Sequence, residues 1–180
     1  MNIRMLMAGV FCIFLLADAL AAGPQTGPVI KAYGPVFEVP EGALNLKARK
    51  TYKVSMDVSA TGESSHDINH YIESAARFLN LHARNGIKPE NIEFAIIVHG
   101  QAGKDLLTDA AYEARFSHAN PNTGLLNALG EAGVKIYLCG QTAAFRGFDE
   151  KELNPSVSMA LSAMTAHVRL QAEGYTLIPF

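Results

Sequence analysis

Short apolar runs alternate along the chain with segments whose apolar residues recur at helical spacing. Residues 92–98 (IEFAIIV) and 134–138 (VKIYL) are almost wholly apolar, which is typical of parallel strands covered on both faces. Residues 52–58 alternate between apolar and polar positions and predict another strand, and a last strand is expected at 175–178. The pattern therefore predicts four buried or half-buried strands spread over the chain.

Helical periodicity and capping residues fill the intervals between these strands. The predicted helices cover residues 67–84, 105–116, 121–133, a short segment from 141, and 155–174. Asn120-Pro121 and Asn154-Pro155 each supply an N-cap residue followed by a proline at the first helical position. The last helix also depends on an apolar stripe expected to face the core, which consists of Val157, Leu161, Met164 and Val168.

Strands that alternate with helices predict βαβ units. The expected fold is α/β: a three-layer sandwich with a central, mostly parallel sheet and helices on both faces. This domain is assigned to residues 51–180, and the proline-rich residues 22–50 are expected to form an extended arm on the domain or on a neighbouring subunit. No GxGxxG sequence and no Walker A loop are present, so the sequence does not support nucleotide binding.

Residues 1–21 have the pattern of a secretory signal peptide. Arg4 provides a positive charge, residues 5–17 form an apolar run, and Ala19-Leu20-Ala21 places small residues at the cleavage positions. The run is short for a membrane span, although an uncleaved anchor stays open as the alternative. Cleavage predicts a periplasmic or secreted protein with no membrane attachment, and it removes Cys12.

Composition narrows the classes of protein that fit this chain. Hydrophobic residues make up 49% of the 180 residues and charged residues 18%, which excludes a disordered chain. A net charge of −2 excludes a broadly basic nucleic-acid binder. Two cysteines are too few for a scaffold held together by several disulfides. Because cleavage of the signal peptide removes Cys12, the mature chain keeps Cys139 as its single thiol.

Candidate chemistry gathers where two predicted strands end. Ligands of open parallel sheets bind beyond the carboxyl ends of the strands, where His99 and Cys139 are expected to share one edge. Cys139 lies between a strand and a short helix, whose backbone N–H groups favour a thiolate. Gly140 permits a tight turn beside the sulfur, and the Gln141 amide is a candidate contact to sulfur or ligand.

Each of these residues also has a purely structural interpretation. A free cysteine is often a small buried hydrophobic residue, and His99 could bond a loop carbonyl instead of assisting a thiolate. Gln141 could be an exposed polar residue at a helix start. His66 and His70 have a spacing that metal sites use, but no third ligand stands at a diagnostic distance in the sequence, so no metal site and no cofactor are predicted.

Four segments of the chain together resemble the DsrE/DsrF-like group of sulfur-relay proteins. They are YKVSMDV (52–58), VHGQA (98–102), NPNTGLLNALGEAGVKIYLCGQTAA (120–144) and NPSVSMALSAMTAHVRLQAEGY (154–175). The combination of CGQ after a strand with the downstream SAM and LQ-x-x-GY patterns is the most specific part. The resemblance covers residues 52–180.

This resemblance implies a small α/β domain that assembles into trimers or hexamers, with Cys139 at the position that carries persulfide sulfur in active members. His99 and Gln141 fall at matching positions to which the family assigns no firm role. The better understood members work in the cytoplasm, whereas this chain has a predicted signal peptide, so their donors and acceptors are not assumed for it.

The leading hypothesis is therefore a periplasmic sulfur-handling protein that carries or transfers sulfane sulfur as a persulfide on Cys139, possessing sulfurtransferase or sulfur-carrier activity. His99 would tune or protonate the site, Gly140 and Gln141 would shape it, and a sulfur donor or acceptor protein would be its partner. The alternative is a non-catalytic oligomeric module of the same fold that binds a small ligand or a protein. A third possibility is an interaction subunit that depends on its extended arm.

Overall fold

The computed structural model describes residues 23–48 and 50–178, and the predicted signal peptide lies outside them. The helices and strands are β1 (Tyr52–Val58), α1 (His70–Arg84), β2 (Ile92–Val98), α2 (Asp109–Phe116), α3 (Thr123–Glu131), β3 (Lys135–Cys139), α4 (Gly140–Arg146), β4 (Val157–Ala160), α5 (Ala163–Ala172) and β5 (Thr176–Ile178). Short 3₁₀ turns occupy Pro89–Asn91, Gly100–Leu106 and Glu150–Glu152. Within the described ranges no helix is long and apolar enough to cross a bilayer.

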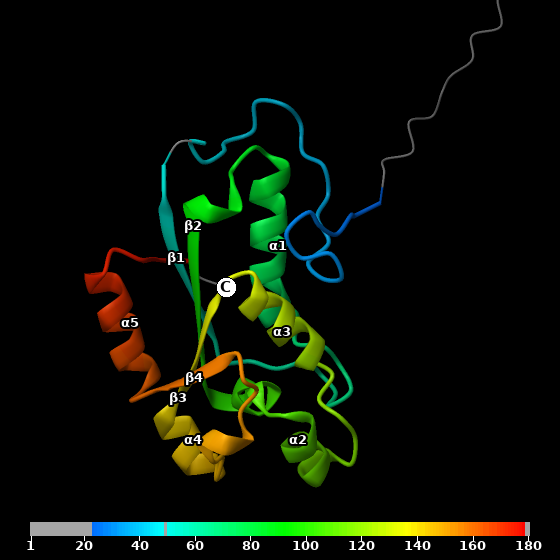
Figure 1. The fold of residues 1–180 in the computed structure, drawn as a ribbon, viewed down its shortest axis with the longest axis vertical. Coiled ribbons are helices and arrows are strands. Elements are labelled where there is room, and N and C mark those ends of the chain that lie inside the picture. The colour runs from blue at the N-terminus through cyan, green and yellow to red at the C-terminus, as the bar shows by residue number, and fades with distance from the viewer. Residues whose placement is uncertain (1–22, 49, 179–180) are drawn as a thin grey trace, which may run out of the picture.

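The five strands form one sheet in the order β4-β3-β2-β1-β5, and every neighbouring pair is parallel. The chain steps outward from β1 to β4, and α5 then carries it back across the sheet to β5. In Figure 1, α1 and α3 lie on one side of the sheet and α5 on the other. The α/β fold expected from the sequence is confirmed, and its sheet is parallel throughout.

The two faces of the sheet bury very different amounts of apolar surface. Alternate strand residues such as Met56, Ile96 and Leu138 face α1 and α3, where they belong to one large buried cluster. Among the described residues, α5 is the helix that covers the opposite face, where the buried cluster consists of Ala95, Ile97, Ala166, Leu170 and Tyr175. Because side chains alternate along a strand, Asp57 and Cys139 fall on this second, thinly covered face.

The predicted helix over residues 155–174 is wrong in its first half. Residues Val157–Ala160 form strand β4, and α5 begins only at Ala163, where the Ser162 hydroxyl accepts a hydrogen bond from the Thr165 amide. The stripe expected in the core is exposed: the fractions are 74% for Leu161, 75% for Met164 and 69% for Val168. Ala163, Ala166 and Leu170 of α5 face the sheet instead, so Met164 and Val168 point outward.

The starts of α2 and α3 differ from the starts that the sequence predicted. Residues 105–116 are not one helix, since the 3₁₀ turn Gly100–Leu106 precedes α2. Asn120 does not cap α3, whose N-cap is Asn122. The Asn120 side chain donates instead to the carbonyls of Asp105 and Leu107, so it joins two loops.

The proline-rich segment before β1 packs against α1 of the same chain. Asn80, fully buried on α1, accepts hydrogen bonds from the amides of Val29 and Ile30. Its amide group donates to the carbonyls of Ile30, Tyr33 and Gly34. One buried side chain thus satisfies five backbone groups of a segment that makes no regular sheet.

Candidate functional site

Cys139 ends β3 and is the N-cap residue of α4, at the carboxyl edge of the sheet. It is a free thiol that is only 6% exposed. Its side chain lies on the α5 side of the sheet, so the start of α5 also approaches it. The sulfur is therefore enclosed by two helix N-termini rather than by the aliphatic cluster on the opposite face.

The polar surroundings of Cys139 outweigh its burial. Burial acts to raise the pKa of the thiol, because a buried thiolate loses hydration. The backbone N–H groups of Thr142 and Ala163 act in the opposite direction, helped by the Thr142 hydroxyl and the Gln141 amide. Together they hold the pKa of Cys139 below its ordinary value, which favours the nucleophilic thiolate.

Two glycines allow these groups to converge on the sulfur. A Cβ on Gly140 would lie 2.8 Å from the Ala160 carbonyl oxygen and 3.1 Å from that of Leu161, so only glycine lets β4 and the following turn pack this closely. That packing delivers the amide of Ala163 to Cys139. Gly103 likewise leaves room for Thr142, which a Cβ there would approach within 2.9 Å.

Thr142 links the ends of β2 and β3. Its hydroxyl oxygen accepts a hydrogen bond of 3.1 Å from the Gly100 amide and also acts on the Cys139 sulfur. The sequence predicted that backbone N–H groups after the cysteine, that of Thr142 among them, point at the sulfur, but it did not single out the Thr142 hydroxyl. Gln141 contributes its backbone amide, while its side chain is exposed.

His99 lies beside Cys139 but is turned toward β1. His99 follows Val98, which pairs with Leu138 on β3, so His99 and Cys139 stand level with each other at the ends of neighbouring strands. Neighbouring strands of a sheet lie about 4.8 Å apart. Its Nε2 lies 3.1 Å from Asp57 Oδ2, and none of the hydrogen bonds found among the described residues joins it to Cys139. His99 is 32% exposed in its side chain, so its ring is reachable from solvent.

Asp57 also binds a second imidazole, which comes from α5. His167 of α5 brings its Nε2 to 2.7 Å from Asp57 Oδ1, and its Nδ1 is buried without a hydrogen-bond partner. Burial acts to raise the pKa of Asp57, but hydrogen bonds from His167 and His99 prevail and lower it. The sequence signal for this cluster was weak: Asp57 is one of the polar residues of a strand that alternates between apolar and polar positions.

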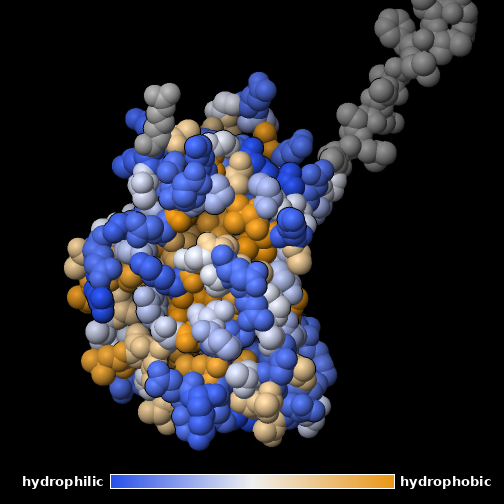
Figure 2. Space-filling model, viewed as in Figure 1, coloured by the Kyte–Doolittle hydropathy of each residue, from blue (hydrophilic) through white to orange (hydrophobic). Residues whose placement is uncertain are grey.

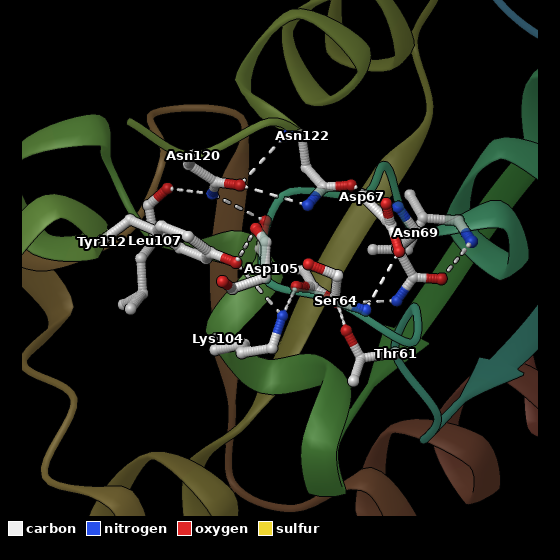
Figure 3. A network of polar contacts seen from close by, with 12 residues as sticks. Thr61, Ser64, Asp67, Asn69, Lys104, Asp105, Leu107, Tyr112, Asn120 and Asn122 are labelled. Carbon is white, nitrogen blue, oxygen red and sulfur yellow. Dashed lines mark hydrogen bonds and ion pairs between the residues drawn. The ribbon is translucent and has the colours of Figure 1, made fainter. Parts of the chain in front are cut away.

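A second polar cluster near the same sheet edge has a structural role (Figure 3). Asp105 is fully buried and accepts hydrogen bonds from Thr61, Asn69 and Lys104. Burial acts to lower the pKa of Lys104, but its bonds to Asp105 and Tyr112 raise it, so the ammonium group stays charged. The contacts of Asp105 with Thr61 and Asn69 join the segment after β1 to the 3₁₀ turn after β2, so this cluster serves to hold the loops together.

The histidines at 66 and 70 do not converge on a metal position. The His66 ring stacks on His118 at 3.8 Å between centroids, while His70 lies against Tyr71. Among residues 23–48 and 50–178, no group of three or more histidine, cysteine, aspartate or glutamate side chains is arranged to hold a metal ion.

A cavity and exposed apolar side chains lie on the α5 side of the sheet, to which Cys139 also belongs but whose cavity it does not line. A cavity of about 330 Å³ runs between β3, β4 and α5 and is lined by Tyr137, Leu161 and Leu170 among others. Exposed apolar residues on α4 and α5 include Phe145 and Met164. In Figure 2, hydrophobic residues reach the surface at the left of the view, over α5 and the segment before it.

Comparison with solved structures supports the fold. A protein of unknown function, MTH1491 from Methanobacterium thermoautotrophicum, matches with a TM-score of 0.52 and 20% identity, covering 72% of this chain and 99% of that one. The ychN protein from E. coli matches with the same TM-score and 14% identity, covering 72% and 100%. No curated protein sequence matches the chain.

The family model of the DsrE/DsrF-like family matches residues 53–180, a range that holds the whole sheet except Tyr52, together with Cys139, His99 and Asp57. The parallel sheet and the thiol at its carboxyl edge are thus part of the matched region. This chain belongs to the DsrE/DsrF-like family.

Proposed function

We propose that the protein carries sulfane sulfur as a persulfide on Cys139 and passes it to an acceptor thiol. Membership of the DsrE/DsrF-like family suggests a sulfur-relay role. The observation that carries the proposal is the lowered pKa of a buried thiol between two helix N-termini. A cysteine that served only as packing would have its pKa raised by the same burial.

The proposed reaction begins with attack by the Cys139 thiolate on the outer sulfur of a donor. A bond forms between Cys139 Sγ and that sulfur, the donor's S–S bond breaks, and the electron pair leaves with the remainder of the donor. Thiosulfate would release sulfite, and an organic persulfide would release a thiolate. An acceptor thiolate then attacks the outer sulfur, and Cys139 leaves as the thiolate that the surrounding amides stabilise.

The residues around Cys139 have separate roles in this reaction. The amides of Thr142, Ala163 and Gln141 stabilise the thiolate before loading and after release. Gly140 keeps the sulfur within reach of the Ala163 amide. Because Cys139 is only slightly exposed, thiosulfate and polysulfide are better suited as donors than a bulky group would be.

Intact-mass measurement tests sulfur loading. Incubation with thiosulfate or polysulfide should add one or more sulfur atoms to the wild type, and a reducing thiol should remove them. Cys139→Ser combined with Cys12→Ser, which has no thiol, should gain none. The matched control is Cys12→Ser in the full chain, which leaves Cys139 as the only thiol and should load like the wild type. A wild type that stays unmodified contradicts the proposal.

We also propose that the protein is periplasmic or secreted and forms a homo-oligomer. The first part is supported by the signal-peptide pattern of residues 1–21. The second is supported by the exposed apolar residues Leu161, Met164 and Val168, which an interface would cover. N-terminal sequencing of the exported protein and sedimentation of the mature chain test the two parts separately.

The second candidate function is that of a non-catalytic binding module. It is favoured by the cavity between β3, β4 and α5, and by the low exposure of Cys139. Binding of a ligand in that cavity would survive Cys139→Ser, and the wild type would transfer no sulfur. The mass experiment therefore separates the two candidates.

A further inference from the structure

Asp57 is a half-exposed carboxylate near the carboxyl edge of the sheet, on the face that α5 covers. Each of its two oxygens contacts one imidazole: Oδ2 meets His99 Nε2 at 3.1 Å, and Oδ1 meets His167 Nε2 at 2.7 Å. The three side chains come from the end of β1, the residue after β2, and the middle of α5. The fold therefore brings them together from positions up to 110 residues apart.

The carboxylate determines which ring nitrogens carry hydrogen. An ionised carboxylate only accepts hydrogen bonds, so Nε2 of both rings must donate. The remaining nitrogen, Nδ1, is then the atom that gains and loses a proton in each ring. The Nδ1 atom of His167 is buried and has no partner, whereas the His99 side chain is about one third exposed. His99 Nδ1 is consequently the better placed of the two for proton exchange.

Resting on the proposed sulfur transfer, we propose that Asp57 is a positioning residue that holds His99 with Nε2–H toward it, so that His99 Nδ1 exchanges a proton beside Cys139. His167 occupies the second carboxylate oxygen and thereby stops Asp57 from rotating away from His99. The titratable groups that contact Asp57 are these two histidines, and Cys139 lies level with His99 on β3. The side chain of α4 nearest the sulfur, Thr142, carries no charge.

The proton transfers of the two half-reactions show why His99 is useful when the donor is a persulfide. During loading, the donor's S–S bond breaks and a thiolate leaves, and the protonated His99 gives its Nδ1 proton to that thiolate. During release, neutral His99 takes the proton of the acceptor thiol, whose thiolate then attacks the outer sulfur on Cys139. The proton returns to His99, so the complete cycle consumes no acid or base.

The test compares the wild type with Asp57→Asn and with Glu173→Gln. Glu173 is an exposed carboxylate of the same layer that pairs with Arg169, so its loss is the matched control. Two properties are measured: the ring tautomers by ¹⁵N NMR of the histidine side chains, and the rate of loading from a small alkyl persulfide between about pH 5 and pH 9.

Asparagine presents one acceptor and one donor, so only one ring can keep Nε2–H directed at it. In Asp57→Asn we expect one histidine to change tautomer and the loading rate to fall by about tenfold or more, since acid–base catalysis typically contributes about 10²–10⁴-fold. The pH profile of loading should differ from that of the wild type, because His99 is no longer held with Nδ1 free to exchange a proton beside Cys139. Glu173→Gln should match the wild type in both measurements.

The outcomes separate this inference from the proposed function. An Asp57→Asn protein that loads sulfur with the wild-type pH profile overturns the role of Asp57 and leaves sulfur transfer standing. A wild type that gains no sulfur overturns both. Should Asp57→Asn fail to fold, His99→Gln replaces it. Loading from the alkyl persulfide should then slow by about tenfold or more while iodoacetamide still alkylates Cys139, and a wild-type loading rate overturns the inference.

Discussion

The two faces of the sheet are built on opposite principles. On the side of α1 and α3, strand residues such as Phe94, Ile96 and Leu138 join a large, wholly apolar cluster. On the side of α5, the positions nearest the carboxyl edge are Asp57, His99 and Cys139, and the apolar cluster beneath them is small. One face therefore supplies the stability of the domain, and the other can hold titratable groups.

This difference explains how a polar site fits into a buried sheet. Charges and thiolates cost free energy in an apolar interior, but here the carboxylate is bonded to two imidazoles and the sulfur to backbone amides. Small residues of α5 such as Ala163 and Ala166 let the helix approach closely enough to provide those partners. Stability and chemistry are thus assigned to separate sides of the same strands.

Matched leucine deletions are the strongest test of the comparison. Leu126 is fully buried against the large cluster, and Leu170 belongs to the small one. We expect Leu126→Ala to lower the free energy of unfolding by about 4 kcal/mol and Leu170→Ala by about 2 kcal/mol, because less surrounding packing is lost at the second site. Urea denaturation measures both. Equal losses would show that the faces contribute alike.

Gly140→Ala should bring a stability cost and a chemical defect together. The new Cβ would press on the Ala160 and Leu161 carbonyl oxygens, which costs about 1–3 kcal/mol of unfolding free energy. Moving that turn also withdraws the Ala163 amide, so the pKa of Cys139 should rise and its alkylation at neutral pH should slow. Gln141→Ala, which fills no such space, is the stability control, and an unchanged Gly140→Ala protein would refute the packing argument.

Thr142→Val keeps the shape of the side chain and removes its hydroxyl. Loss of the hydrogen bond from the Gly100 amide should cost about 1 kcal/mol of unfolding free energy. The pKa of Cys139 should move upward, because one group that stabilises the thiolate is lost. The pH dependence of iodoacetamide alkylation measures the shift, and Thr176→Val on exposed strand β5 should leave it unaltered. A Thr142→Val protein with the wild-type pH dependence would exclude this contribution.

Acidification should produce the smallest difference. The pKa of Asp57 is lowered in the folded chain, so its contribution to stability is present above the ordinary aspartate pKa and disappears as the pH falls through the lowered value. The stability difference between the wild type and Asp57→Asn should therefore shrink as the pH falls below about 4, the ordinary pKa of an aspartate. Denaturation midpoints at a series of pH values measure it. A difference that grows with acid would contradict the assigned direction.

Local pattern was sufficient where one physical requirement governed a segment. Residues 92–98 were predicted as a buried strand and are β2 with the same bounds, because a continuous apolar run bounded by turns suits a central parallel strand. The strand-to-helix junction at Cys139 was also predicted, since a short apolar run is followed directly by a glycine. The N–H groups after the cysteine belong to that same local geometry.

Local pattern misled where two structures satisfy it equally. Val157, Leu161, Met164 and Val168 have helical spacing, but the first lies in β4 and the others are exposed. Residues Val157–Ala160 form a strand because they pair with β3. The spacing of apolar residues within one segment carries no information about such a partner strand. The packing of a single chain also does not explain why apolar side chains of this stripe face outward, since exposed apolar patches usually mark interaction surfaces.

The amino-acid sequence by itself determined the α/β class, the buried strands and a cysteine at a strand end, because each follows from hydrophobic period and turn chemistry within a few residues. Only the tertiary structure decided that Ala163 faces the Cys139 sulfur and that His167 shares Asp57 with His99. These contacts join segments far apart along the chain, and they exist because α5 crosses from one edge of the sheet to the other.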